Sequence, residues 1–167
     1  MIRTFNPKDR GSLDMLMLKL QKHFTDVDTL AESLPFKDIK SAHSYMQQMI
    51  DDVDSMGGVI YVADESDGVI GFAQGVIINH APGDNAVFYT THGARKDGWI
   101  GLIFVEPEHR GGGIGRSLID AMKEYFKNKG CDTIRLLVLS GNAHAIDIYR
   151  QYGFEPHEFE MAMKIKK

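Results

Sequence analysis

The chain has 167 residues, 43% hydrophobic and 25% charged, a composition typical of one globular domain over residues 1–167. Nineteen Lys and Arg face 23 Asp and Glu, and the formal charge of −4 argues against a nucleic-acid-binding protein with a clustered basic surface. The single cysteine, Cys131, excludes an intramolecular disulfide and a cysteine-rich zinc site, and fits a reducing cytoplasmic location. The longest apolar run, residues 99–105, is too short for a bilayer, so we expect no membrane insertion.

The hydrophobic periodicity predicts elements in the order β-α-α-β-β-β-α-β-α-β, with no visible repeat. Residues 65–68 have the composition of a hairpin turn between two strands rich in Val and Ile. The expected strands are 2–5, 59–63, 69–78, 99–105, 134–139 and 159–165, and the expected helices are 13–23, 41–54, 113–129 and 142–152. Residues 79–96 are expected to form a loop or an irregular strand, and the pattern as a whole indicates a mixed sheet with helices on both faces.

The most informative stretch is the glycine-rich turn Arg110-Gly111-Gly112-Gly113-Ile114-Gly115, which joins a buried strand to the strongest helix. Glycines there permit positive φ and leave backbone N–H groups open, and the helix N-terminus adds partial positive charge. This combination predicts a phosphate site. The spacing fits neither a Walker A loop nor the dinucleotide fingerprint, and a tight turn without a ligand is the alternative interpretation.

The turn contains the block Arg110-x-x-Gly113-x-Gly115, and a second block follows, Asn142-x-x-Ala145-x-x-x-Tyr149-x-x-x-Gly153-Phe154. Together the two blocks resemble the acetyl-coenzyme A signature of the GNAT N-acetyltransferase superfamily. The resemblance implies an α/β (α+β) three-layer fold, with a central mixed, mostly antiparallel sheet of six to seven strands and helices on both faces. It also implies that two central strands splay apart around the pantetheine arm of acetyl-CoA, the cosubstrate.

The resemblance further assigns residues to the cofactor. Backbone groups of Ile103 and Val105 are expected to bond pantetheine as an added strand would, and the Val105 N–H is the candidate oxyanion donor. Asn142 is expected to contact the cofactor, to cap its helix, or both. The pyrophosphate is expected at the turn and the residues that flank it: Arg110, Gly111, Gly112, Gly113, Ile114, Gly115 and Arg116.

Tyr149 is the candidate general acid, because a phenol can donate a proton to the departing thiolate. It lies two helical turns after Asn142 on the same face, although a core aromatic would have the same spacing. The general base is less determined, since residues 99–103 contain no glutamate. Glu106 is the nearest catalytic candidate; His109, His92 and Asp97 are further options, each of which also fits a solvated surface group, and a water chain would suffice.

The seven histidines are scattered, so no metal site is expected. Cys131 is remote from both motifs in sequence and is expected to have a structural role. We therefore expect no acetyl-cysteine intermediate and predict direct transfer in a ternary complex.

Residues 25–54 carry seven acidic side chains against two lysines. This excess favours a cationic amine as the acceptor, either a small molecule or a protein amino group. The alternative interpretation is that the acidic side chains only form solvated helix faces. A homodimer is compatible with the sequence, and a non-catalytic sensor that binds coenzyme A is the alternative function.

Overall fold

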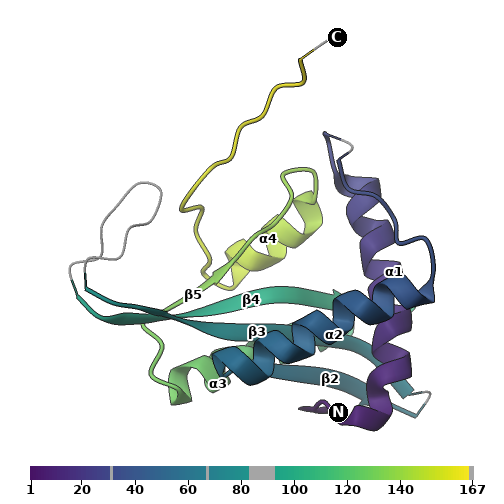
Figure 1. Cartoon of the computed structure of the whole chain (residues 1–167), viewed down its shortest axis with the longest axis horizontal. Helices are drawn as coiled ribbons and strands as arrows, with labels where there is room; N and C mark the ends of the chain where they lie inside the picture. The colour runs from purple at the N-terminus through teal and green to yellow at the C-terminus, as the bar shows by residue number, and fades with distance from the viewer. Residues whose placement is uncertain (31, 67, 83–92, 166–167) are drawn as a thin grey trace.

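A computed structural model describes residues 1–30, 32–66, 68–82 and 93–165. Its strands form one sheet in the order β1-β2-β3-β4-β5, antiparallel except for the parallel pair β4 and β5 (Figure 1). The strands are β1 (Ile2–Thr4), β2 (Val59–Glu65), β3 (Gly68–His80), β4 (Arg95–Val105) and β5 (Thr133–Leu136). The helices are α1 (Arg10–Val27), α2 (Ile39–Met56), α3 (Ile114–Asn128) and α4 (Ala143–Gln151), with single 3-10 turns at Pro7–Asp9 and Pro107–His109.

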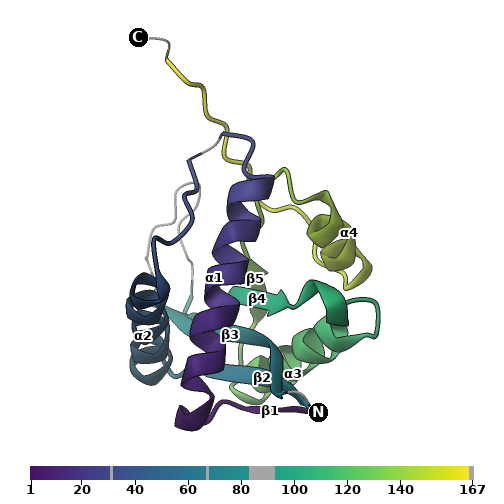
Figure 2. The same cartoon turned by 90° about the vertical axis from the view of Figure 1, so that its right-hand side faces the viewer.

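Helices cover both faces of the sheet, as the sequence predicted. One apolar cluster joins α1 and α2 to Val62, Phe72 and Phe104. The other joins α3 to the opposite face, where Phe126 is fully buried. Figure 2 shows α1 and α2 on one side of the strands and α3 on the other. None of the described helices combines the length and the apolarity that a bilayer span requires.

The expected six to seven strands are wrong for the described residues, where the sheet has five. The missing strand is the one predicted over residues 159–165. After α4 the chain instead extends away from the body of the protein and joins no strand (Figure 1). Phe159, Met161, Met163 and Ile165 are 80–94% exposed. Their alternation indicates a strand with one apolar face, but a strand also needs a hydrogen-bonded neighbour, and none of the described strands pairs with this segment.

Two other predicted segments end at different residues in the structure. The segment 79–96, expected to form a loop or an irregular strand, is paired at both ends: Asn79 pairs with Lys96 and His80 with Arg95. Polar side chains do not prevent backbone pairing, so hydrophobic alternation missed this part of the hairpin. The strand expected over 134–139 stops at Leu136, where β4 and β5 diverge.

A bulge in β4 lies immediately beside that divergence. Gln74 pairs with Leu102 and Gly75 pairs with Ile100, which leaves Gly101 as the extra residue. Glycine suits this position because a Cβ at residue 101 would lie 2.5 Å from the buried Gln74 amide oxygen. The last pair between β4 and β5 is Ile100 with Leu136, so the strands separate just where the bulge occurs.

The paired end of β4 and β5 is held by Asp97, which is 1% exposed. Its carboxylate accepts bonds from Arg95 and Arg135 at 3.0 Å each, lies 3.1 Å from His80, and accepts a bond from the Thr133 hydroxyl. These partners come from β3, β4 and β5. The network therefore ties three strands together at one end, while the gap opens at the other.

Candidate active site

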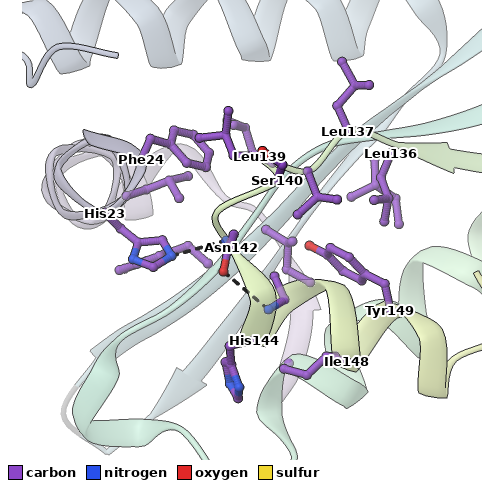
Figure 3. A pocket seen from close by; sticks show the side chains of 18 of the residues that line it. His23, Phe24, Leu136, Leu137, Leu139, Ser140, Asn142, His144, Ile148 and Tyr149 are labelled. Atoms are coloured by element: carbon purple, nitrogen blue, oxygen red, sulfur yellow. Dashed lines mark hydrogen bonds between the residues drawn. The ribbon is translucent and has the colours of Figure 1, made fainter. Parts of the chain in front are cut away.

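A cavity of about 1480 Å³ occupies the gap between β4 and the segment that follows β5. Ile100 to Val105 line one wall, and residues 136–140 line the other. Figure 3 labels Leu136, Leu137, Leu139 and Ser140 of the second wall. The end of α1 with the segment after it, the start of α3, the inner side of α4 and part of the C-terminal segment also line the cavity, as does Tyr45 of α2. The cavity thus brings together the two sequence blocks that lie about one helix and one strand apart in the chain.

One wall of the cavity presents unpaired strand amides. In an antiparallel ladder, alternate residues direct their N–H and C=O groups to the same neighbour. The Glu106 N–H donates to the Ile70 carbonyl at 2.9 Å, so Ile103 and Val105 direct theirs away from β3, into the gap. The Val105 carbonyl also faces away from β3, because it accepts a hydrogen bond from Arg110 Nε at 2.9 Å. An extended ligand can add to this edge as a strand does.

The glycine turn closes one end of the cavity. Gly111 and Gly113 have φ of 86° and 83°, in the left-handed region that glycine adopts without strain. Gly113 occupies the N-cap of α3 without a side-chain cap, so the first N–H groups of the helix have no intrahelical partner. Gly111, Gly113, Ile114 and Gly115 line the cavity, whereas Gly112 is not among the lining residues.

Two arginines flank this turn. Arg110 folds back over the Phe104 ring, with 5.6 Å between the guanidinium carbon and the ring centroid, and Arg116 lies at the same distance from Tyr152. Both line the cavity. Open amides, a helix N-terminus and two fixed cations make this end of the cavity suited to a diphosphate.

Tyr149 projects from α4 into the cavity (Figure 3). Its ring packs edge-on against Phe154, with 5.8 Å between the centroids. Burial raises the pKa of the Tyr149 phenol to about 12, so the hydroxyl stays protonated throughout the physiological range. The side chain thus combines the core aromatic contact with a protonated group that faces the cavity.

Asn142 caps α4 and also contacts α1. Its Oδ1 accepts a bond from the Ala145 N–H at 3.3 Å, and its Nδ2 lies 3.4 Å from His23 Nε2 on α1 (Figure 3). The contact is possible because the β5–α4 loop lies directly on the end of α1: a Cβ at Gly141 would be 2.1 Å from the Val27 carbonyl oxygen. Our sequence analysis missed His23, because no local pattern indicates which distant loop a helix residue meets.

The structure does not bring the other proton-accepting candidates into the cavity. Glu106 forms an ion pair with Lys19 and is not a lining residue. His109 lies 3.7 Å from the Glu65 carboxylate, and Asp97 is enclosed by its network at the other end of β4. His92 lies outside the described residues.

Charge is distributed unevenly around the cavity. The arginines come from the glycine turn, whereas Asp28 and Glu32 follow α1, and Glu158 and Glu160 belong to the C-terminal segment. The Asp28 carboxylate accepts backbone bonds from residues 30, 32 and 33, which lower its pKa to about 2 and keep it ionised. The other five acids that we singled out in residues 25–54 do not line the cavity.

Metal binding and nucleophilic catalysis by a cysteine find no support among the described residues. No group of three or more His, Cys, Asp or Glu side chains gathers there in a metal-binding arrangement. Cys131 lies outside the cavity, and burial raises the pKa of its thiol, which disfavours the reactive thiolate.

Comparison with known proteins agrees with this geometry. The chain is 45% identical over 51 residues to the thialysine N-epsilon-acetyltransferase of Bos taurus, and the match covers 30% of each chain. The fold matches a mutant protein from Bacillus halodurans, with a TM-score of 0.80, 18% identity and 99% of both chains covered. It also matches a "predicted acetyltransferase" of Clostridium acetobutylicum crystallised with acetyl-CoA, with a TM-score of 0.67, 20% identity and 98% and 95% of the two chains covered. The model of the acetyltransferase (GNAT) family matches residues 25–154, and the chain belongs to that family, whose members use acetyl-CoA as cosubstrate.

Proposed function

We propose that this protein is an N-acetyltransferase that moves the acetyl group of acetyl-CoA directly to a primary amine within a ternary complex. The observation that carries the proposal is the opening of the unpaired β4 edge onto the glycine turn and Tyr149 within one cavity. A binding module without catalysis would need only the turn and the edge. No observation favours that alternative.

The residues of the cavity fit acetyl-CoA. A Cβ at Gly111 or Gly113 would meet nothing within 4 Å, so open space lies against the turn where a diphosphate would bind. The N–H groups of Gly111, Gly113, Ile114 and Gly115 would hold the diphosphate, with Arg110 and Arg116 beside it; Gly112 would act through the backbone conformation of the turn. Ile103 and Val105 would bond the extended arm. When bound, the thioester supplies an activated acetyl group.

The chain contributes three further actions to the transfer. The Val105 N–H would donate to the acetyl carbonyl oxygen as negative charge develops on it, an interaction commonly worth about 2.7–4 kcal/mol in the transition state. Tyr149 would protonate the departing thiolate. The walls would exclude water while the amine attacks. Glu106 has no part in this proposal, because its carboxylate is paired with Lys19 away from the cavity.

The acceptor that fits best is an amine carried on a cationic molecule. Asp28, Glu32, Glu158 and Glu160 line the cavity away from the glycine turn. Carboxylates there would raise the local concentration of cations. One relative is named for its action on thialysine, a lysine analogue. Small polyamines and protein amino groups both meet this description.

A direct test is thiol release from acetyl-CoA in the presence of single amines. We would use thialysine, spermidine, glucosamine and a lysine-containing peptide, with glycerol as an oxygen nucleophile for comparison. Transfer to at least one amine, with initial rates that give intersecting double-reciprocal plots, is expected for a ternary complex. Parallel plots, which indicate a covalent acetyl-enzyme, would contradict the direct mechanism.

Tyr149→Phe is expected to lower kcat by about 10²–10⁴-fold and to leave the Kd of coenzyme A nearly unchanged. The substitution removes only the hydroxyl and keeps the ring contact with Phe154. Steady-state kinetics and calorimetric titration measure the two quantities. Tyr125→Phe is the matched control, because that hydroxyl lies outside the cavity, 2.8 Å from each of the Gly57 and Gly58 carbonyl oxygens. Full activity in Tyr149→Phe would remove Tyr149 from the mechanism.

A further inference from the structure

We propose that His23 is the general base of this transfer and takes the proton that the acceptor amine releases as it bonds to the acetyl carbon. The role rests on the proposed function. Its starting point is the position of His23: the side chain lies on α1, lines the cavity and meets Asn142, the residue that begins α4. No sequence motif marks this residue.

The contact with Asn142 fixes which ring nitrogen carries the lone pair. Asn142 Oδ1 faces the Ala145 N–H, so Nδ2 is the atom that faces His23. An amide nitrogen only donates, so His23 Nε2 must accept and the proton of the neutral ring must reside on Nδ1. At 3.4 Å the bond is longer than the usual 2.9–3.0 Å, so it orients the ring but holds the lone pair weakly. Because Nε2 has a single lone pair, the Asn142 amide must move aside when Nε2 takes a proton.

The surroundings of His23 keep the ring neutral. Burial lowers the pKa of the His23 imidazole, and the positive charge of Arg110 lowers it further. His144 on α4 acts in the same direction, whereas Asp26 on α1 raises the pKa. The imidazole is therefore in its proton-accepting form at neutral pH, which is the form that a general base requires.

The other titratable groups of the described cavity are less suited to the task. Asp28 is a very weak base, because three backbone N–H groups hold its carboxylate. Glu32, Glu160 and His144 are exposed to solvent, and Glu158 lies 3.1 Å from His157. The Tyr149 phenol is protonated before the reaction, so it cannot accept the amine proton. His23 is thus the half-buried base of the cavity, and it lies across from the hydroxyl that we assign as the acid.

The proton balance of the step is complete without another reactant. The amine nitrogen bonds to the acetyl carbon, and the carbon–sulfur bond breaks. The amine proton passes to His23 Nε2, and the leaving sulfur takes the Tyr149 hydroxyl proton. The imidazolium and the phenolate that remain then exchange one proton through water, which restores both side chains.

The test is the variant His23→Gln, because a glutamine oxygen can still accept the Asn142 bond but cannot take up a proton at neutral pH. We expect kcat at pH 7.5 to fall by about 10²–10⁴-fold, with the Kd of coenzyme A within twofold of wild type. Wild-type kcat/KM should fall as the pH drops through the pKa of His23, and the variant should lose this limb. Full activity in His23→Gln would show that the residue only positions Asn142 and would overturn the proposal.

A readout without ligand comes from NMR of the histidine rings in the free protein. We expect His23 to titrate below the usual imidazole range as the Nδ1–H tautomer; an Nε2–H tautomer would overturn the proposal. His109→Gln, outside the cavity, is the matched control and should keep wild-type kcat. An equal loss there would show that the effect is not specific to His23. Wild-type protein that binds coenzyme A but acetylates none of the tested amines would overturn the proposed function, and this role with it.

Discussion

Gly113→Asp is expected to weaken the binding of coenzyme A at least about 100-fold. The residue has φ of 83° at the N-cap of α3 and faces the cavity, so the aspartate would place a negative charge against the diphosphate. Like charges in contact cost several kcal/mol, and each 1.4 kcal/mol is tenfold in affinity. Calorimetric titration with coenzyme A measures the change.

The matched control for this variant lies at the other end of the same helix. Gly130 also has positive φ, 72°, and open space around its Cβ position, but it does not line the cavity. Gly130→Asp therefore introduces the same backbone strain and the same charge without touching the ligand. Coenzyme A affinity should stay close to wild type in Gly130→Asp. Equal losses in both variants, or retained affinity in Gly113→Asp, would contradict the anion site at the turn.

Asp97→Asn is expected to lower the free energy of unfolding by about 3–5 kcal/mol, because it leaves two partly buried guanidinium groups without their anion. The carboxylate is 1% exposed and bonds Arg95 and Arg135 at 3.0 Å. Urea unfolding measures the change. Asp26→Asn is the control: Asp26 pairs with Lys22 at 2.9 Å on the surface, where such a pair is worth at most about 1 kcal/mol. A similar loss in both variants would contradict a special role for Asp97.

The same network predicts an acid dependence of stability. Burial alone would raise the pKa of Asp97, but the Thr133 hydroxyl and the guanidinium groups outweigh it and hold the pKa below its usual value. A lowered pKa stabilises the fold above the pKa of the unfolded carboxyl, about 3.9, and the stabilisation is lost as the pH falls through the lower value of the folded state. Asp97→Asn should remove this contribution from the pH profile.

Local chemistry made part of this molecule predictable. The glycines at residues 110–115 predict a turn with positive φ, and apolar residues at helical spacing predict α3. Asn142 is a residue type that commonly caps a helix. In each case the determining partners lie within a few residues along the chain, so the sequence contains the whole physical argument.

What could not be predicted depends on contacts between distant segments. His23 acquires its role from Gly141, which lets a loop lie on the end of α1. Glu106 is close to the motif in sequence but bonds Lys19 instead. The alternation near residue 161 indicates an apolar face, yet it says nothing about a neighbour to cover that face. Such outcomes depend on which surfaces meet, and periodicity carries no information about that.

The bulge at Gly101 and the turn at Gly111 mark the two ends of a short interval. The end of β4 and the 3-10 turn after it set the separation between the point where the amides change direction and the point where the anion would be held. In the proposed binding mode, this interval would act as a molecular ruler for the ligand's arm. A one-residue insertion between them would keep both end sites intact yet misalign the reactive carbon with the acceptor, so affinity and turnover would respond separately to its length.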